Sequence, residues 1–139
     1  MAFWLVKSEP DAYSWDQQVA DKVTPWTGVR NHSAKLNLQA MRVGDRAFFY
    51  HSNIGKEVVG VVEVVREAYP DPTAEDGSPW VCVDMQAVAP MPTPVTLAAI
   101  KAEPSLAQIA LVRLSRLSVQ PVTPAEWKTI CRMGGLKGA

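Results

Sequence analysis

The 139-residue chain has only two cysteines and no excess of either charge. Each of these two observations excludes some classes of function. Cys82 and Cys131 form no CxxC motif and lack metal-ligand spacing, so we interpret them as buried thiols of a reduced, cytoplasmic protein. Lysine and arginine total 14, and aspartate and glutamate also total 14. Such a balance disfavours a sequence-blind DNA binder, whose affinity rests on many phosphate contacts.

Signatures of membrane proteins and of several enzyme classes are missing as well. No apolar run approaches the length of a membrane span, and no targeting segment is recognisable, so we expect no membrane attachment. The GxSxG elbow, the phosphate loop and the zinc deaminase signature are all absent. His32 and His51 have no carboxylate or thiolate partner at metal-ligand spacing. We therefore expect neither a metal nor another cofactor.

A core large enough for one domain over residues 1–139 is predicted from the 47% of hydrophobic residues. Residues 58–65 are an almost unbroken β-branched run, which predicts a central strand buried on both faces. Gly60 within this run indicates the close approach of a backbone or a ligand. With no βαβ alternation, these features favour a mixed α+β domain around a curled, barrel-like sheet.

Local signals predict the remaining elements. Short apolar runs predict further strands over residues 3–6, 46–51, 80–88 and 115–119, which gives about five to six strands in all. Capping boxes at Ser14 to Gln17 and at Thr123 to Glu126 predict helices over about 15–21 and 124–133, and Asn31 is the natural N-cap of a helix to residue 41. One or two helical turns are predicted over 96–102. The prolines at 90, 92 and 94 predict a stiff connector.

Residues 26–31, with the sequence WTGVRN, carry most of the functional information. They combine a tryptophan, a glycine, a guanidinium and a helix-capping asparagine. A ring that can stack, next to a cation at a helix start, can hold a base and its phosphate. Polar residues also follow the apolar runs at 7–10 (KSEP) and end the run at 49–52 (FYHS). Three strand ends that each supply polar groups predict a pocket.

These segments resemble the EVE domain family, a branch of the PUA-like superfamily. The matching motifs are WLVKSEP at 4–10, WTGVRN at 26–31, FYHS at 49–52 and VRLSRLSV at 112–119, and they span nearly the whole chain. The layout is also similar to that of the YTH domain, a reader of methylated adenine in RNA. The resemblance implies a PUA-like pseudo-barrel with short helices packed around it, and a pocket that accepts a modified base extruded from a strand.

The resemblance also implies the site residues. The base pocket is expected to contain Ser8, Trp26, Asn31, Tyr50, His51, Ser52 and Trp80. The phosphate-binding rim is expected to contain Lys7, Arg30 and Arg113. Trp26 would stack on one face of the base. Trp80 lies roughly where the YTH family has a second cage tryptophan, and there it would stack on the other face. Ordinary structural roles remain open: Trp26 could be core, Arg30 a salt-bridge partner, Asn31 only a cap, and His51 a strand-end hydrogen-bonding group.

The resulting interpretation is a non-catalytic, monomeric binding module whose partner is DNA or RNA with a modified base. One alternative comes from the neighbouring ASCH branch, in which some members hydrolyse acylated nucleosides. In that case Lys7 would be the base, Ser8 the nucleophile or orienting group, and Glu9 the acid. A second alternative is a scaffold that binds a protein through a sheet edge.

Overall fold

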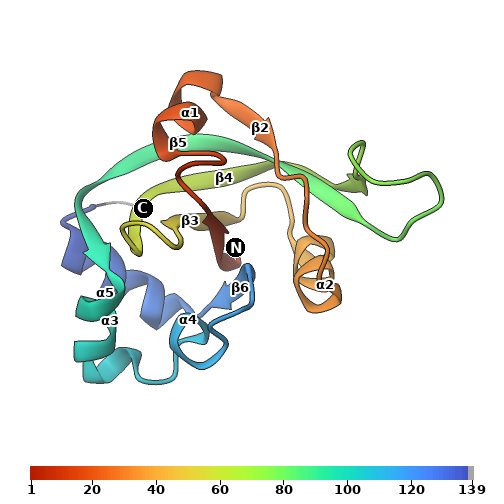
Figure 1. Cartoon of the computed structure of the whole chain (residues 1–139). Helices are drawn as coiled ribbons and strands as arrows, with labels where there is room; N and C mark the ends of the chain where they lie inside the picture. Colours follow the sequence, from red (N-terminus) through yellow and green to blue (C-terminus); the bar gives the residue numbers. More distant parts are fainter. Residues whose placement is uncertain (138–139) are drawn as a thin grey trace.

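A mixed sheet of six strands organises the chain, in the order β2-β5-β4-β3-β1-β6 (Figure 1). The structure is a computed structural model and describes residues 1–137. The strands are β1 Phe3–Ser8, β2 Val23–Pro25, β3 Arg46–His51, β4 Glu57–Pro70, β5 Val81–Thr96 and β6 Val119–Val122. β1 runs parallel to β3, and the other neighbouring strands are antiparallel. This is the predicted α+β pseudo-barrel.

Four of the helices begin where the local signals predict, whereas α4 and the 3-10 turn η1 were not predicted. They are α1 Trp15–Asp21, α2 His32–Ala40, α3 Leu97–Ala102, α4 Ala110–Arg113 and α5 Pro124–Gly134, with a short 3-10 turn η1 at Pro104–Leu106. Both predicted capping boxes are present, one from Ser14 to Gln17 and one from Thr123 to Glu126. The Asn31 side chain caps α2. These three predictions are confirmed because each depends only on neighbouring residues.

The sheet separates two cores. Trp4 of β1 and Phe49 of β3 pack on one side with α1 and α2, whereas Leu5 and Phe48 pack on the other with α5. Successive side chains of a strand point to opposite faces, which explains this split. Figure 1 shows α3, α4 and α5 gathered together, away from α1 and α2. Both cysteines are free and buried, as predicted, one in β5 and one in α5.

Strand β4 is central in the sheet, as its β-branched run predicts. Gly60 of this strand faces the indole ring of Trp15, and a Cβ atom added at Gly60 would lie 2.5 Å from that ring. The predicted close approach is therefore real, but it is made by an aromatic side chain and by neither a backbone nor a ligand. The absence of a side chain at Gly60 lets α1 pack directly on the sheet.

Two predictions about the second half of the chain are wrong. Pro90, Pro92 and Pro94 lie within β5 and do not form a connector. In the described residues β2 pairs with β5 only at Asp84–Gln86, so the later part of β5 has one strand neighbour, and such edges tolerate proline. The strand predicted over 115–119 begins only at Val119, because the residues before it form turns.

Candidate functional site

A pocket of about 470 Å³ opens beside Trp26. It lies where the end of β1, the turn before α1 and the segment around β2 meet. Its lining residues are Lys7, Ser8, Glu9, Ala12, Tyr13, Thr24, Pro25, Trp26 and Thr27. The volume is within the roughly 300–1,000 Å³ that is usual for small-ligand sites. Aromatic walls with hydroxyl and charged groups at the edge suit a flat, polar ligand.

Trp26 is at once a core residue and a wall of this pocket. It is 8% exposed, and its ring meets Tyr13 and Phe49 edge-on at centroid distances of 6.4 Å and 5.5 Å. Its backbone N–H donates to the carbonyl of Val83 at 2.7 Å. A core role and a base-stacking role for Trp26 are therefore compatible, because packing holds the ring rigid at the pocket edge. A rigid ring needs little ordering when a ligand stacks on it.

The end of β1 supplies the polar wall. The Ser8 hydroxyl donates to the carbonyl of Tyr13 at 2.5 Å, and Lys7 Nζ donates to the carbonyl of Ser115 at 2.7 Å. Burial lowers the pKa of the Lys7 ammonium from its ordinary value. Asn53 Nδ2 donates to Glu9 Oε1 at 2.7 Å. Each of these three side chains is thus oriented by a specific neighbour.

His51 and Ser52 are not among the lining residues of the pocket, but each is hydrogen-bonded to a segment next to it. His51 Nε2 accepts the backbone N–H of Trp15 at 3.0 Å, which helps to fix the first turn of α1. Burial lowers the pKa of His51, and the charges of Glu57 and Asp16 partly oppose that effect. The backbone N–H of Ser52 donates to the carbonyl of Ser8 at 3.0 Å. His51 thus connects the end of β3 to α1, and Ser52 connects the residue after β3 to Ser8 in the pocket wall.

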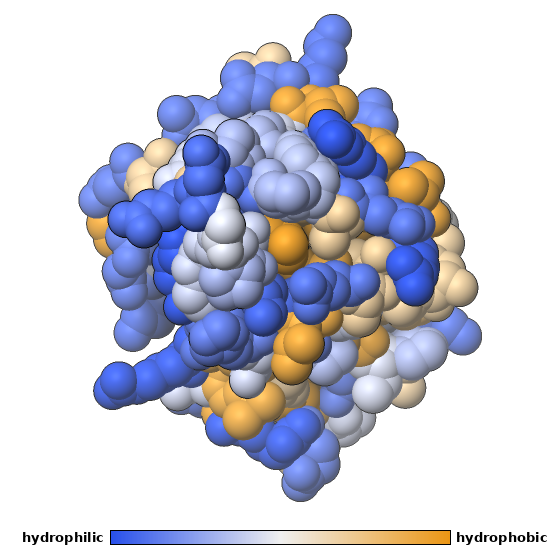
Figure 2. Space-filling view, turned by 90° about the vertical axis from the view of Figure 1, so that its right-hand side faces the viewer, coloured by the Kyte–Doolittle hydropathy of each residue, from blue (hydrophilic) through white to orange (hydrophobic). Residues whose placement is uncertain are grey.

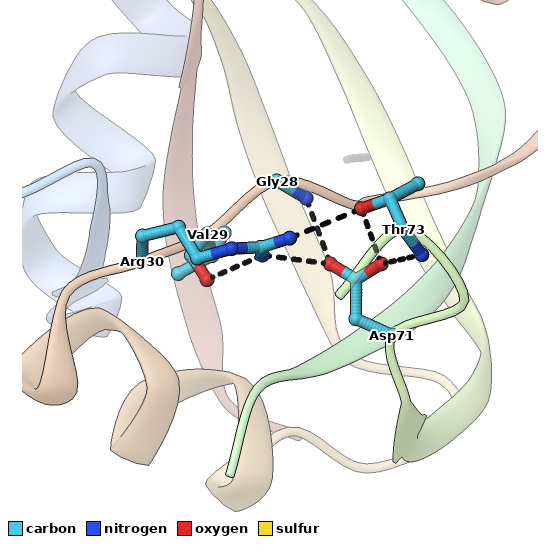
Figure 3. Close-up of polar contacts among 5 residues, drawn as sticks. All are labelled: Gly28, Val29, Arg30, Asp71 and Thr73. Carbon is cyan, nitrogen blue, oxygen red and sulfur yellow. Dashed lines mark hydrogen bonds and ion pairs between the residues drawn. The ribbon is translucent and has the colours of Figure 1, made fainter. Parts of the chain in front are cut away.

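A buried carboxylate holds the loop that follows Trp26 (Figure 3). Asp71 Oδ2 accepts the backbone N–H of Gly28 at 2.9 Å and Arg30 Nη1 at 3.1 Å. Asp71 Oδ1 accepts the backbone N–H and the hydroxyl of Thr73 at 2.7 Å and 2.6 Å. Burial raises the pKa of Asp71, but the hydrogen bonds from Thr73, Gly28 and Arg30 outweigh it and hold that pKa at about 2.

Sequence reasoning missed the role of Asp71 because Gly28 and Arg30, the residues it holds in the loop after Trp26, lie 43 and 41 residues away along the chain. Nothing in its surrounding sequence marks it as different from other loop aspartates. Tyr13 was missed as well, although it directly precedes a helix cap next to the KSEP motif. That position, between two recognised signals, is the one sequence feature that points to it.

Arg30 is primarily a salt-bridge partner. Its guanidinium contacts Asp71 and the Thr73 hydroxyl, and its side chain is 38% exposed. The same guanidinium lies 5.9 Å from the ring centroid of Trp80, and that ring lies 4.8 Å from the ring of His32. Trp80 therefore belongs to a separate group with Arg30 and His32. It is not among the residues that line the pocket of Trp26.

Three further predicted site residues lie away from this pocket. Asn31 caps α2 and lines a neighbouring pocket of about 380 Å³ with residues of the α4–β6 loop. Tyr50 is 3% exposed and packs in the core on the opposite face of the sheet, because strand alternation gives the Trp26 side to Phe49. Arg113 is exposed on α4, and its Nε donates to the carbonyl of Gln108 at 2.7 Å.

Residues 1–137 contain neither of two further kinds of site. In this part of the chain no group of three or more His, Cys, Asp and Glu side chains is arranged to hold a metal ion. None of the helices described there has the length and apolar character needed to cross a membrane. The cytoplasmic location stays a prediction.

Comparison with known proteins agrees with the fold. The EVE domain model matches residues 2–133. Human thymocyte nuclear protein 1 is 34% identical over 157 residues, which cover 89% of this chain and 70% of that protein. A crystal structure of a protein from Agrobacterium tumefaciens is 51% identical, with a TM-score of 0.97 and coverage of 100% of this chain and 97% of the other.

Two structures of nucleic-acid complexes are also similar. Human THYN1 protein in complex with 5-methylcytosine containing DNA is 31% identical, with a TM-score of 0.90 and coverage of 96% and 98% of the two chains. A Zygosaccharomyces rouxii YTH domain in complex with N6-methyladenosine RNA has a TM-score of 0.62 at 14% identity, covering 96% of this chain and 86% of the other. The second likeness shows a shared fold.

Proposed function

This chain belongs to the EVE domain family, and we propose that it is a non-catalytic module that binds a modified base in DNA or RNA. The observation that carries the proposal is the pocket beside Trp26, which combines a fixed aromatic wall with polar side chains. A human relative, similar over nearly the full length of this chain, is described in complex with 5-methylcytosine containing DNA. A methylated base is therefore the ligand class that we assign.

The base would leave its strand and enter the pocket, since a base within a duplex stack cannot reach a concave site. Its ring would stack on Trp26, an interaction worth about 1–3 kcal/mol per base. Hydroxyl groups of Ser8, Thr24 and Thr27 line the same pocket and would meet the polar edge of the base. His51 and Ser52 would act indirectly, by holding α1 and β1 in place.

Few cationic side chains would contact the phosphates of the nucleic acid. Lys7 lines the pocket, and Arg30 retains 38% side-chain exposure despite its salt bridge. The formal net charge is zero, so the protein has no overall positive charge that would attract the strand. We therefore expect modest affinity and a shallow dependence on salt, because the salt slope scales with the number of neutralised phosphates. We assign Arg113 no phosphate contact, since it is bonded to its own loop.

The two alternative functions have less support. In the described residues no hydrogen bond joins the Ser8 hydroxyl to Lys7 or Glu9, and the hydroxyl donates instead to the carbonyl of Tyr13. An activated nucleophile needs a base within hydrogen-bonding reach, so the amidohydrolase reading lacks its central pair. Figure 2 shows hydrophilic and hydrophobic residues interspersed on one face of the molecule, and the sheet-edge scaffold has no specific contact of the described residues in its favour.

The test is a binding titration with matched oligonucleotides. Fluorescence anisotropy would compare strands that carry one 5-methylcytosine, one N6-methyladenine or only unmodified bases, in single-stranded and duplex form. We expect at least one modified strand to bind several times more tightly than its unmodified match. Lys128→Gln, an exposed change on α5 away from the pocket, should behave like the wild type. Equal affinity for every strand, or release of an acyl group from an acylated nucleoside, would refute the proposal.

A further inference from the structure

We propose that Glu9 makes the pocket select bases with an exocyclic amino group, of the cytosine or adenine type, over bases with a carbonyl at that position. The inference rests on the proposed function and specifies its ligand class. Glu9 is the acidic residue among the side chains that line the pocket beside Trp26. An ionised carboxylate accepts hydrogen bonds and donates none, so its position at a base-binding pocket restricts which base edge fits.

One oxygen of the exposed Glu9 carboxylate accepts a hydrogen bond from the protein, and the other is open to a ligand. Its backbone carbonyl accepts the N–H groups of Ala12 and Tyr13, both at 2.9 Å, which anchors the residue at the pocket edge. Its Oε1 accepts Asn53 Nδ2 at 2.7 Å, which orients the side chain. Among the described residues, Oε2 has no hydrogen-bond partner. This oxygen is therefore available to accept a hydrogen bond from a ligand.

Two hydroxyl donors at the pocket are engaged elsewhere. The Ser8 hydroxyl donates its one hydrogen to the carbonyl of Tyr13, so it faces a ligand as an acceptor. The Tyr13 hydroxyl donates to Asp21 Oδ2 at 2.8 Å. Lys7 Nζ is turned towards Ser115, which lines the neighbouring pocket. Lys7 Nζ keeps two further hydrogens, but the Ser8 hydroxyl oxygen and Glu9 Oε2 are both placed to accept a hydrogen bond at the edge formed by β1.

Hydrogen-bond acceptors at this edge of the pocket would distinguish two bases of nearly identical shape. 5-Methylcytosine and thymine both carry a methyl group at C5. At C4, however, the first presents an amino donor and the second a carbonyl acceptor. A carboxylate accepts from the amino group of cytosine, whereas it repels the carbonyl of thymine. Glu9 would thus favour the first base over the second, although both would stack equally well on Trp26.

The experiment measures one affinity ratio in three proteins. Single-stranded oligonucleotides that are identical except for one 5-methylcytosine or one thymine are titrated against the wild type, Glu9→Gln and Glu75→Gln. We expect the wild type to bind the 5-methylcytosine strand about tenfold more tightly, the scale of one base-edge contact. Glu9→Gln should bring the ratio close to one, because an amide can donate to the thymine carbonyl. Glu75 is exposed on the β4–β5 loop, so its variant should keep the wild-type ratio.

The possible outcomes separate this inference from the proposed function. A wild type that prefers a modified strand over its unmodified match, but has the same 5-methylcytosine-to-thymine ratio as Glu9→Gln, would overturn the role of Glu9 and leave the proposed function standing. A wild type that binds both strands equally would also overturn it. A wild type with no preference for any modified base would overturn the proposed function itself. Glu9 is exposed, so Glu9→Gln should fold normally, and circular dichroism checks this.

Discussion

The carboxylate of Asp71 lies 3.1 Å from Nη1 of Arg30, and the same oxygen accepts the backbone N–H of Gly28 at 2.9 Å. One buried side chain therefore fixes both ends of the short loop that follows Trp26. Gly28 has a φ of +84°, a left-handed conformation that glycine adopts at little cost. The glycine and the carboxylate together hold this loop in one conformation before any ligand arrives.

Removing the charge of Asp71 should loosen this loop. Asp71→Asn keeps the shape of the side chain, but its amide is a weaker acceptor and one of its two ends is a donor. We expect the free energy of unfolding to fall by about 2 kcal/mol, the scale of hydrogen bonds to a charged group, and base binding to weaken with it. Urea unfolding and anisotropy measure the two effects. Unchanged stability and affinity would show that Asp71 does not organise the loop.

Trp26 should contribute to both stability and binding. Replacing a buried tryptophan with alanine costs about 3–5 kcal/mol, so Trp26→Ala should unfold more readily than the wild type. Where it is folded, we expect its affinity for the modified base to fall by about tenfold to a hundredfold. Trp80→Ala is the matched control and should keep the discrimination between bases. If Trp26→Ala keeps full affinity and discrimination while folded, Trp26 is only a core residue.

His51 should make the stability of the fold depend on pH. Its Nε2 accepts a hydrogen bond, which requires the neutral ring, and burial lowers its pKa in the folded protein. The folded state thus binds fewer protons than the unfolded state. The contribution of His51 is complete above the unfolded pKa of about 6.5 and is lost as the pH falls from there through the folded pKa.

The measurement is chemical denaturation at pH 7.5 and at pH 5.5. We expect the wild type to lose up to about 1 kcal/mol at the lower pH, the worth of one hydrogen bond. His51→Gln retains an acceptor but cannot titrate in this range, so its loss should be smaller. His32→Gln changes the other histidine of the chain and should keep the wild-type response. An equal loss in all three proteins would assign the pH effect to other groups.

Elements fixed by neighbouring residues could be predicted from the sequence. Asn31 caps α2 through the backbone N–H three residues later, and the capping boxes of α1 and α5 span equally short distances. The course of β5 could not be predicted in this way. Whether a strand tolerates Pro90 depends on whether a neighbouring strand needs its N–H, and the length of β2, far away in the sequence, decides that.

Some residues of the candidate site could be predicted from the sequence, and others could not. Lys7, Ser8 and Trp26 lie together because each belongs to a segment that ends at the pocket. Tyr50 was expected in the base pocket but packs on the opposite face of the sheet, because two consecutive aromatic residues fit either alternation until the sheet fixes which one faces Trp26. The partner of Arg30 could not be foreseen, since Asp71 lies 41 residues away and meets it only in the folded protein.

The central claim, that a modified base leaves its strand and stacks on Trp26, is tested most directly by a crystal structure of the protein bound to DNA with a single 5-methylcytosine. We predict that the methylated base lies in the pocket lined by Lys7, Ser8, Glu9 and Trp26, with its amino group within hydrogen-bonding distance of Glu9. A complex in which the methylated base remains stacked in its strand, or binds outside this pocket, would contradict the account.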